Sequence, residues 1–230
     1  MSRILLLETS TSLCSAAIAE DGKVISYRES SSPRAHASLT AVFVGELLKE
    51  GGWSVKDMDA VCVSEGPGSY TGLRVGVSTA KGLCFGAGKP LLSVGTLDTL
   101  VAQAGAEGLV PEGCTRIIPM VDARRMEVYA AVFTPEGKRL SEVEPAIIDE
   151  NSFAEVLSEG PVLVIGDGAG KCNGVIGGED TVFIQCCPKA SAMAELAERE
   201  YKEKRFKDVA YFEPFYLKEF AVTQSRKKLF

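Results

Sequence analysis

The segment RILLLETSTSLCSAAIAEDGKVISYRE, residues 3–29, has the same pattern as IPMVDARRMEVYAAVFTPEGKRLSEVEPAI, residues 118–147. In each, an apolar strand ends in an acid, a polar connection leads to a second strand with paired alanines, and a glycine–lysine turn leads to a third. Glu8 and Asp122 lie 114 residues apart, and so do Ala16 and Ala130. Because the interval persists across two strands, we infer an internal duplication of a three-stranded antiparallel meander. The expected strands are 3–9, 14–20 and 23–29 in the first copy and 118–122, 127–133 and 138–147 in the second.

Helices and single strands alternate after each meander. We expect helices at 36–50, 73–86, 96–106, 152–159 and 190–204, strands at 59–64, 91–94, 162–165 and 181–185, and a glycine-rich loop at 166–178. Thr96 is the expected N-cap of its helix. Two such halves resemble the actin-like, Hsp70-like and sugar-kinase-like plan, an α/β fold of duplicated βββαβαβα halves, here with the second half reduced.

The expected division of the chain is residues 1–108, residues 109–212 and a tail at 213–230. The helix at 190–204 is a candidate to pack back on the first half. The tail combines aromatic residues with the basic run Arg226-Lys227-Lys228, and this composition fits a solvated end and a partner contact equally well.

The 230 residues are 46% apolar and 24% charged, which is typical of globular proteins and excludes a mainly disordered chain. The formal net charge of −6 argues against a free-standing nucleic-acid binder, because such proteins usually present a basic face. The first apolar run is too short for a signal segment, and no stretch approaches the roughly 20 apolar residues of a membrane span. We therefore expect a cytoplasmic protein.

The chain contains one histidine, His36, and seven cysteines without a CxxC pair. A zinc site that needs two histidines is excluded, and Thr40 stands where an HxxxH pair would place its second ligand. We expect His36 to be a capping or interface residue and the cysteines to be reduced core residues, which indicates a reducing compartment.

The connection after the first strand of each half is where actin-like enzymes approach nucleotide phosphates. Such connections usually carry glycines that let backbone amides close on a phosphate, and neither Glu8-Thr9-Ser10-Thr11-Ser12 nor Asp122-Ala123-Arg124-Arg125 has one. Arg124 and Arg125 fit either a phosphate contact or a salt bridge across a cleft. We interpret both connections as remains of a phosphate site.

The loop GDGAGK at 166–171 is a second place to look for a nucleotide. A P-loop needs a glycine at Ile165 and a hydroxyl residue at Cys172, and a dinucleotide fingerprint needs a glycine at Lys171. A weak nucleotide contact and a plain glycine-rich turn both remain open. The weak cofactor candidates of the chain are Glu8, Thr9, Asp122, Gly166 and Gly168.

The segment GPGSYTGLR at 66–74 opens a helix whose N-terminus suits an anion. Each interior glycine of that helix costs about 1 kcal/mol relative to alanine, so close approach of a second helix is expected in return. Helix 36–50 is apolar on every side, which indicates either a core helix covered twice or a helix with one face on another chain. The expected partner-interface residues are His36, Leu39, Thr40, Phe43, Leu47, Gly72, Gly76, Thr79 and Leu83.

Four segments resemble the bacterial TsaB family, also called YeaZ. They are LLETSTS at 6–12, GPGSYTGLRVGVSTAKGLCFGAGK at 66–89, LSVGTLDTL at 92–100 and VDARRMEVYAAV at 121–132. The resemblance implies an actin-like fold and pairing, through the helices at 36–50 and 73–86, with a homologous TsaD catalytic subunit that carries the metal. It also implies a TsaE ATPase as a further component.

The resemblance further implies a function in forming threonylcarbamoyladenosine next to the anticodon of tRNA. The TsaB-like chain would be the non-catalytic subunit, without a cofactor of its own, with ATP or ADP shared at the partner interface and tRNA contacted only through the complex. For the chain alone, a monomer and a homodimer through the same face are both open. The alternatives are an ATP-dependent small-molecule kinase of the same fold and, ranked last, the glycoprotease-like peptidase that older labels of the family suggest.

Overall fold

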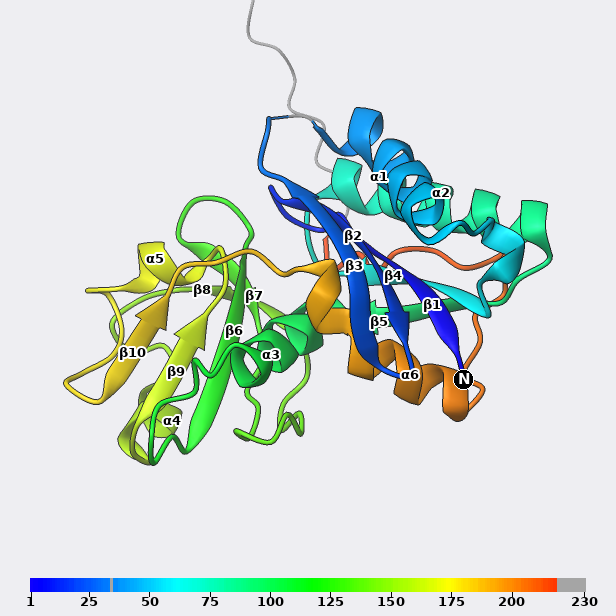
Figure 1. Ribbon diagram of the computed structural model, residues 1–230. Coiled ribbons are helices and arrows are strands. Elements are labelled where there is room, and N and C mark those ends of the chain that lie inside the picture. Colours follow the sequence, from blue (N-terminus) through cyan, green and yellow to red (C-terminus); the bar gives the residue numbers. More distant parts are fainter. Residues whose placement is uncertain (34, 219–230) are drawn as a thin grey trace, which may run out of the picture.

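The computed structural model describes residues 1–33 and 35–218, and in this part of the chain two five-stranded sheets share one topology (Figure 1). The first sheet has the order β3-β2-β1-β4-β5 and the second the order β8-β7-β6-β9-β10. In both, the first strand pairs antiparallel with the second and parallel with the fourth, so the internal duplication is confirmed. The strands are β1 (Arg3–Glu8), β2 (Cys14–Glu20), β3 (Lys23–Ser30), β4 (Ala60–Gly66), β5 (Leu91–Gly95), β6 (Arg116–Asp122), β7 (Glu127–Ala130), β8 (Glu144–Ile147), β9 (Val162–Ile165) and β10 (Thr181–Ile184).

The two meanders are not in the same register throughout. Glu8 pairs with Ser15, whereas Asp122 pairs with Val128, so the connection between the first two strands is one residue shorter in the second half. The interval of 114 residues therefore relates the first strands but not the second ones. The third strand of the second meander is also shorter than predicted, because most residues from 136 to 144 are exposed and lack the alternation of a half-buried strand.

Helices cover both faces of the first sheet. The helices α1 (Ala35–Gly51) and α2 (Tyr70–Ala87) lie on one face, while η2 (Ala190–Met193) and α6 (Ala194–Lys202) lie on the other (Figure 1). The helix α3 (Thr96–Ala106) packs between the halves, and Gly95, not Thr96, is its N-cap. The remaining helices are η1 (Val55–Asp57), α4 (Ala154–Ser158) and α5 (Ala169–Cys172), the last of which lies inside the predicted glycine-rich loop. None of the helices among the described residues is long and apolar enough to span a bilayer.

The helix predicted at 190–204 packs back on the first half. Ala190, Met193, Ala194 and Ala197 form one buried cluster with side chains of β1, β2, β4 and β5. Residues 190–202 therefore belong with the first sheet, although they follow the second half in sequence. The cysteines are all free, and four of them are buried: Cys14, Cys62, Cys84 and Cys172.

The C-terminal segment 205–218 runs along the first half and reaches the second. The backbone N–H of Lys207 donates to the carbonyl of Leu91 at 2.8 Å, and that of Phe215 to the carbonyl of Glu65 at 2.7 Å. Lys218 then forms an ion pair with Glu127 on β7. The described part of the predicted tail therefore contacts both halves, and the basic run 226–228 lies outside the described residues.

Candidate functional site

Residues 8–12 at the end of β1 form the first connection, and residues 122–125 at the end of β6 form the second connection. The two connections face each other across a cavity of about 600 Å³ between the two halves. The first half contributes Ser10, Thr11, Ser12, His36 and the start of α2, and the second half contributes residues 121–124, Tyr129 and Asp167. The segment Phe215–Lys218 forms a third wall, and we call this cavity the cleft.

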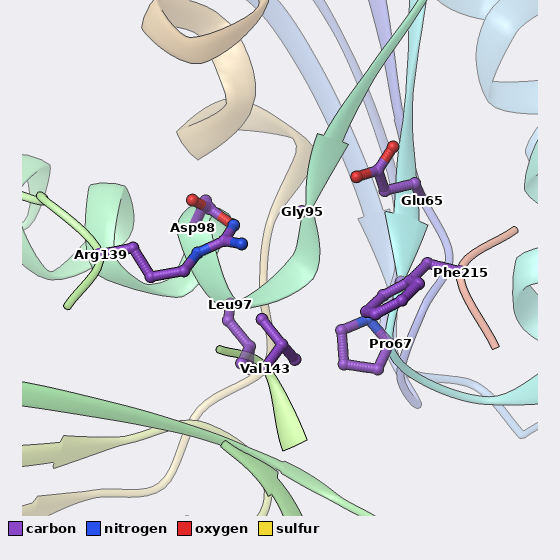
Figure 2. A pocket seen from close by; sticks show the side chains of 9 residues that line it. Glu65, Pro67, Gly95, Leu97, Asp98, Arg139, Val143 and Phe215 are labelled. Atoms are coloured by element: carbon purple, nitrogen blue, oxygen red, sulfur yellow. The ribbon is translucent and has the colours of Figure 1, made fainter. Parts of the chain in front are cut away.

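A smaller cavity of about 230 Å³ adjoins the cleft and shares Pro67 and Phe215 with it (Figure 2). Figure 2 shows Asp98 and Arg139 together on one wall and Phe215 beside Pro67 on another. Because Asp98 and Arg139 form an ion pair, the guanidinium is already neutralised within the chain.

Glu8 ends β1 and is fully buried. One carboxyl oxygen, Oε1, accepts a hydrogen bond from the backbone N–H of Ser10 at 2.6 Å, and Oε2 has no hydrogen-bond partner in the described part of the chain. Burial raises the pKa of Glu8 to about 7, against which the hydrogen bonds from Ser10 act. A carboxyl group that is fully buried and about half protonated at pH 7 does not fit a magnesium ligand, which must be ionised and accessible.

The glycines at the start of α2 let the helix pack directly on the first connection. A Cβ atom on Gly68 would lie 2.3 Å from the carbonyl oxygen of Ser10, and one on Gly72 would lie 2.1 Å from that of Thr9. The N–H of Ser69 donates to the Ser10 carbonyl at 2.6 Å, and Oγ1 of Thr9 donates to the Gly72 carbonyl at 2.8 Å. The GPGSYTG segment therefore serves contacts within the chain, where the sequence indicated an anion or a neighbouring helix.

In the second half, the side chain of Lys171 contacts the second connection. Its Nζ forms an ion pair with Asp122 and donates to the carbonyls of Arg125 and Glu127 at 2.7 and 2.6 Å. The N–H of Asp122 donates to Oδ1 of Asp167 at 2.9 Å, and burial raises the pKa of Asp167 to about 6. An ammonium group thus stands beside the acid that would hold a magnesium ion, and the residues of neither connection fit a magnesium nucleotide.

Gly166 and Gly168 also lie close to another part of the same chain, the carbonyl oxygen of Met120. Cβ atoms there would lie 2.1 and 3.1 Å from the carbonyl oxygen of Met120, and the N–H of Gly168 donates to that oxygen at 3.0 Å. The sequence left a weak nucleotide contact and a plain glycine-rich turn open for this loop. These contacts favour the glycine-rich turn.

Most of the expected partner-interface residues lie inside this chain. Thr40, Phe43, Leu47, Gly72 and Gly76 are buried, and His36, Leu39, Thr79 and Leu83 are half-buried. Phe43 and Leu47 belong to the core between the first sheet and α1. A Cβ atom on Gly76 would lie 2.2 Å from Oγ1 of Thr9. Five of the nine expected interface residues are therefore buried within this chain, and the four half-buried ones remain the part of the prediction that a partner could contact.

The outer face of α1 and α2 is formed by other residues of the same helices. Its small and apolar exposed residues are Ala37, Ser38, Ala41, Val42, Gly45, Ser78, Gly82, Phe85 and Gly86, and the polar residues Glu46, Lys49, Glu50, Thr71 and Arg74 are exposed on the same helices. Phe85 is 86% exposed and Val42 is 47% exposed. No atom lies within 4 Å of a Cβ built on Gly45, Gly82 or Gly86. The helical spacing of these residues was visible in the sequence, but nothing there distinguished this side from the buried one.

Comparisons with known proteins agree with this architecture. The family model of TsaD, described as tRNA N6-adenosine threonylcarbamoyltransferase, matches residues 29–211. The chain is 31% identical to the tRNA threonylcarbamoyladenosine biosynthesis protein TsaB of Escherichia coli over 94% of both chains. It is also 31% identical to TsaB of Bacillus subtilis, over 94% of this chain and 93% of the relative. The solved structure of YeaZ from Pseudomonas aeruginosa superposes with a TM-score of 0.82 at 26% identity, covering 94% of this chain and 100% of that one. The chain belongs to the TsaB (YeaZ) family.

Proposed function

We propose that this chain is a non-catalytic subunit of the complex that forms threonylcarbamoyladenosine in tRNA, and that it activates a TsaD-like catalytic subunit by docking on it. The names of its relatives place them in this biosynthesis. Two features of this chain support a role without chemistry. The sole histidine has no second histidine four residues on, and Lys171 neutralises the acid of the second connection.

The outer face of α1 and α2 is the observation that carries the docking proposal. Phe85 is 86% exposed and Val42 is 47% exposed on two neighbouring helices, and exposed apolar residues that gather in this way mark protein interfaces. Gly45, Gly82 and Gly86 of the same helices have open space above them among the described residues. Glycines without neighbours allow the backbone of a second helix pair to approach closely, and Val42 and Phe85 supply apolar contacts.

The remaining components of the assembly follow from the same proposal. A TsaE-like ATPase is the third protein, ATP or ADP binds at the interface with the partner, and the outer face supports a homodimer when the partner is missing. The net charge of −6 places most of the tRNA contact on the partner, and seven free cysteines suit a reducing cytoplasm.

Replacing Val42 or Phe85 with glutamate is expected to abolish co-purification with the TsaD-like subunit, because a charge would be buried in the interface without a partner. The thermal midpoint of the isolated chain should stay near that of the wild type, since both side chains are exposed. The matched control is Ile147→Glu on β8, whose side chain is 76% exposed on the second half. Size-exclusion chromatography with mass detection distinguishes the variants, and full assembly of both Val42→Glu and Phe85→Glu would refute docking through this face.

The isolated chain is expected not to bind magnesium ATP, because Glu8 is buried and Asp122 is paired with Lys171. Isothermal titration calorimetry of the isolated chain measures this directly. Binding with a micromolar dissociation constant would instead favour the small-molecule kinase interpretation.

A further inference from the structure

The turn between β6 and β7 holds two consecutive arginines in the left-handed region of backbone conformation. Arg124 has φ 71° and Arg125 has φ 49°, a conformation that is strained for a residue other than glycine, asparagine or aspartate. The turn is held there by its neighbours. The N–H of Arg124 donates to Oδ1 of Asp122 at 2.9 Å, the N–H of Glu127 donates to the Arg124 carbonyl at 3.2 Å, and Lys171 binds the Arg125 carbonyl. The chain thus fixes two arginines where glycine or asparagine would be less strained.

Neither guanidinium is neutralised by the described residues. Both arginines are exposed, and neither forms an ion pair within residues 1–33 and 35–218. Two of the neighbouring acids have other cations, because Asp122 is paired with Lys171 and Glu127 with Lys218, while Asp167 accepts a hydrogen bond from the N–H of Asp122. Although the whole chain carries a net charge of −6, this turn forms a positive edge, in which Arg124 lines the cleft and Arg125 follows it in sequence.

Aromatic rings and hydroxyl groups line the cleft beside this positive edge. Tyr70, Tyr129 and Tyr216 are among the lining residues. The ring of Tyr70 contacts the ring of Tyr216, with 5.0 Å between the centroids, and the guanidinium of Arg74 lies 4.1 Å from the Tyr70 centroid, which leaves Tyr129 and Tyr216 as the rings for bases. Oγ of Ser10 and Oγ1 of Thr11 are buried and have no hydrogen-bond partner among the described residues, and both residues line the cleft. A positive edge with aromatic rings next to it is the arrangement that binds single-stranded nucleic acid, with cations on the phosphates and rings stacked on the bases.

We propose that the mouth of the cleft contacts the tRNA directly, with Arg124 and Arg125 on successive phosphates of an unpaired stretch. This inference rests on the proposed function, since it adds a contact between this chain and the substrate of the complex. A polynucleotide fits better than a free magnesium nucleotide, because Glu8 is buried, Asp122 is paired with Lys171, and two adjacent arginines match a charge that repeats along a backbone. The location is suitable as well, because Tyr70 and Arg74 lie in the first turns of α2, whose later turns carry the outer face.

The test replaces both arginines with asparagine, which removes the two charges and adopts the left-handed conformation readily. The matched control is the double variant Lys23→Gln and Lys56→Gln, which also removes two exposed, unpaired charges but lies away from the cleft. Each chain is assembled with its TsaD-like partner, and the affinity for tRNA is measured by fluorescence anisotropy at several salt concentrations. We expect the arginine variant to bind about tenfold more weakly, with the slope of log affinity against log salt reduced by about 1.4, while the control retains the wild-type values.

The mass of each complex, measured before RNA is added, separates the outcomes. An intact complex with unchanged affinity and slope overturns the RNA contact. If the arginine variant no longer binds the TsaD-like partner, the RNA contact is overturned as well. The turn between β6 and β7 would then bind an acidic surface of the partner protein and not the tRNA. Failure of the wild-type chain to assemble would refute the proposed function itself and would be seen in the mass alone.

Discussion

The Gly72→Ala variant of the isolated chain is expected to lose about 3 kcal/mol of unfolding free energy. The new methyl group would lie 2.1 Å from the carbonyl oxygen of Thr9, a distance at which the backbone of either the first connection or α2 must move. Neither can move easily, because Oγ1 of Thr9 donates to the Gly72 carbonyl and the N–H of Ser69 to the Ser10 carbonyl. Urea denaturation followed by circular dichroism measures the change.

Gly82→Ala on the same helix is the matched control. No atom lies within 4 Å of its Cβ position, so the change should gain up to about 1 kcal/mol from the higher helix propensity of alanine. Opposite signs for the two variants would establish that the early glycines of α2 serve packing within the chain. Equal stability of Gly72→Ala and the wild type would contradict the close contact with Thr9.

The Glu8→Gln variant is expected to be more stable than the wild type by about 3 kcal/mol at pH 8. Burial raises the pKa of Glu8 from 4.5 to about 7 in the folded state. Below pH 4.5 both states are protonated and the group has no effect. As the pH rises to 7, ionisation favours the unfolded state, so the wild type loses stability over this range and stays at the lower level above it. Glutamine has the shape of the protonated acid and keeps the acceptor for the N–H of Ser10.

Unfolding free energies of both proteins between pH 4.5 and 8 test this prediction. The difference between them should be smallest at the acidic end and should increase up to pH 7. Glu112→Gln is the control, because Glu112 is exposed and its replacement should leave the curve of the wild type unchanged. A constant difference across the whole range would show that Glu8 does not change its ionisation on folding.

The sequence was sufficient for the fold because its signals are local. The meander pattern and the helical periods predicted most elements to within a few residues, including α3 and β9. Local signals could not predict which side of α1 and of α2 is buried and which is exposed. Phe43 and Val42 are adjacent apolar residues, and only the packing of α1 on the sheet decides that the first is buried and the second exposed.

The chemistry of the cleft could not be predicted in full, because it depends on contacts between residues that are far apart in sequence. The sequence indicated that the phosphate connections lack glycines, but not that Lys171 pairs with Asp122, 49 positions earlier. It also left two interpretations for the arginines. A salt bridge across the cleft is wrong, since neither arginine has an acid partner among the described residues. The sequence predicts a close neighbour for the glycines of α2. For Gly72 and Gly76 that neighbour is Thr9 of the first connection and not a second helix, whereas Gly82 and Gly86 have no close neighbour among the described residues.

The packing of α6 has a consequence for how the chain folds during synthesis. One face of the first sheet, with Ile4, Leu6 and Leu92, is covered only when residues 190–202 arrive. While the ribosome is still translating the second half, that apolar face is open and the first sheet has one layer of helices instead of two. We therefore expect nascent chains that end near residue 108 to bind holdase chaperones, and release to follow once α6 has emerged from the exit tunnel.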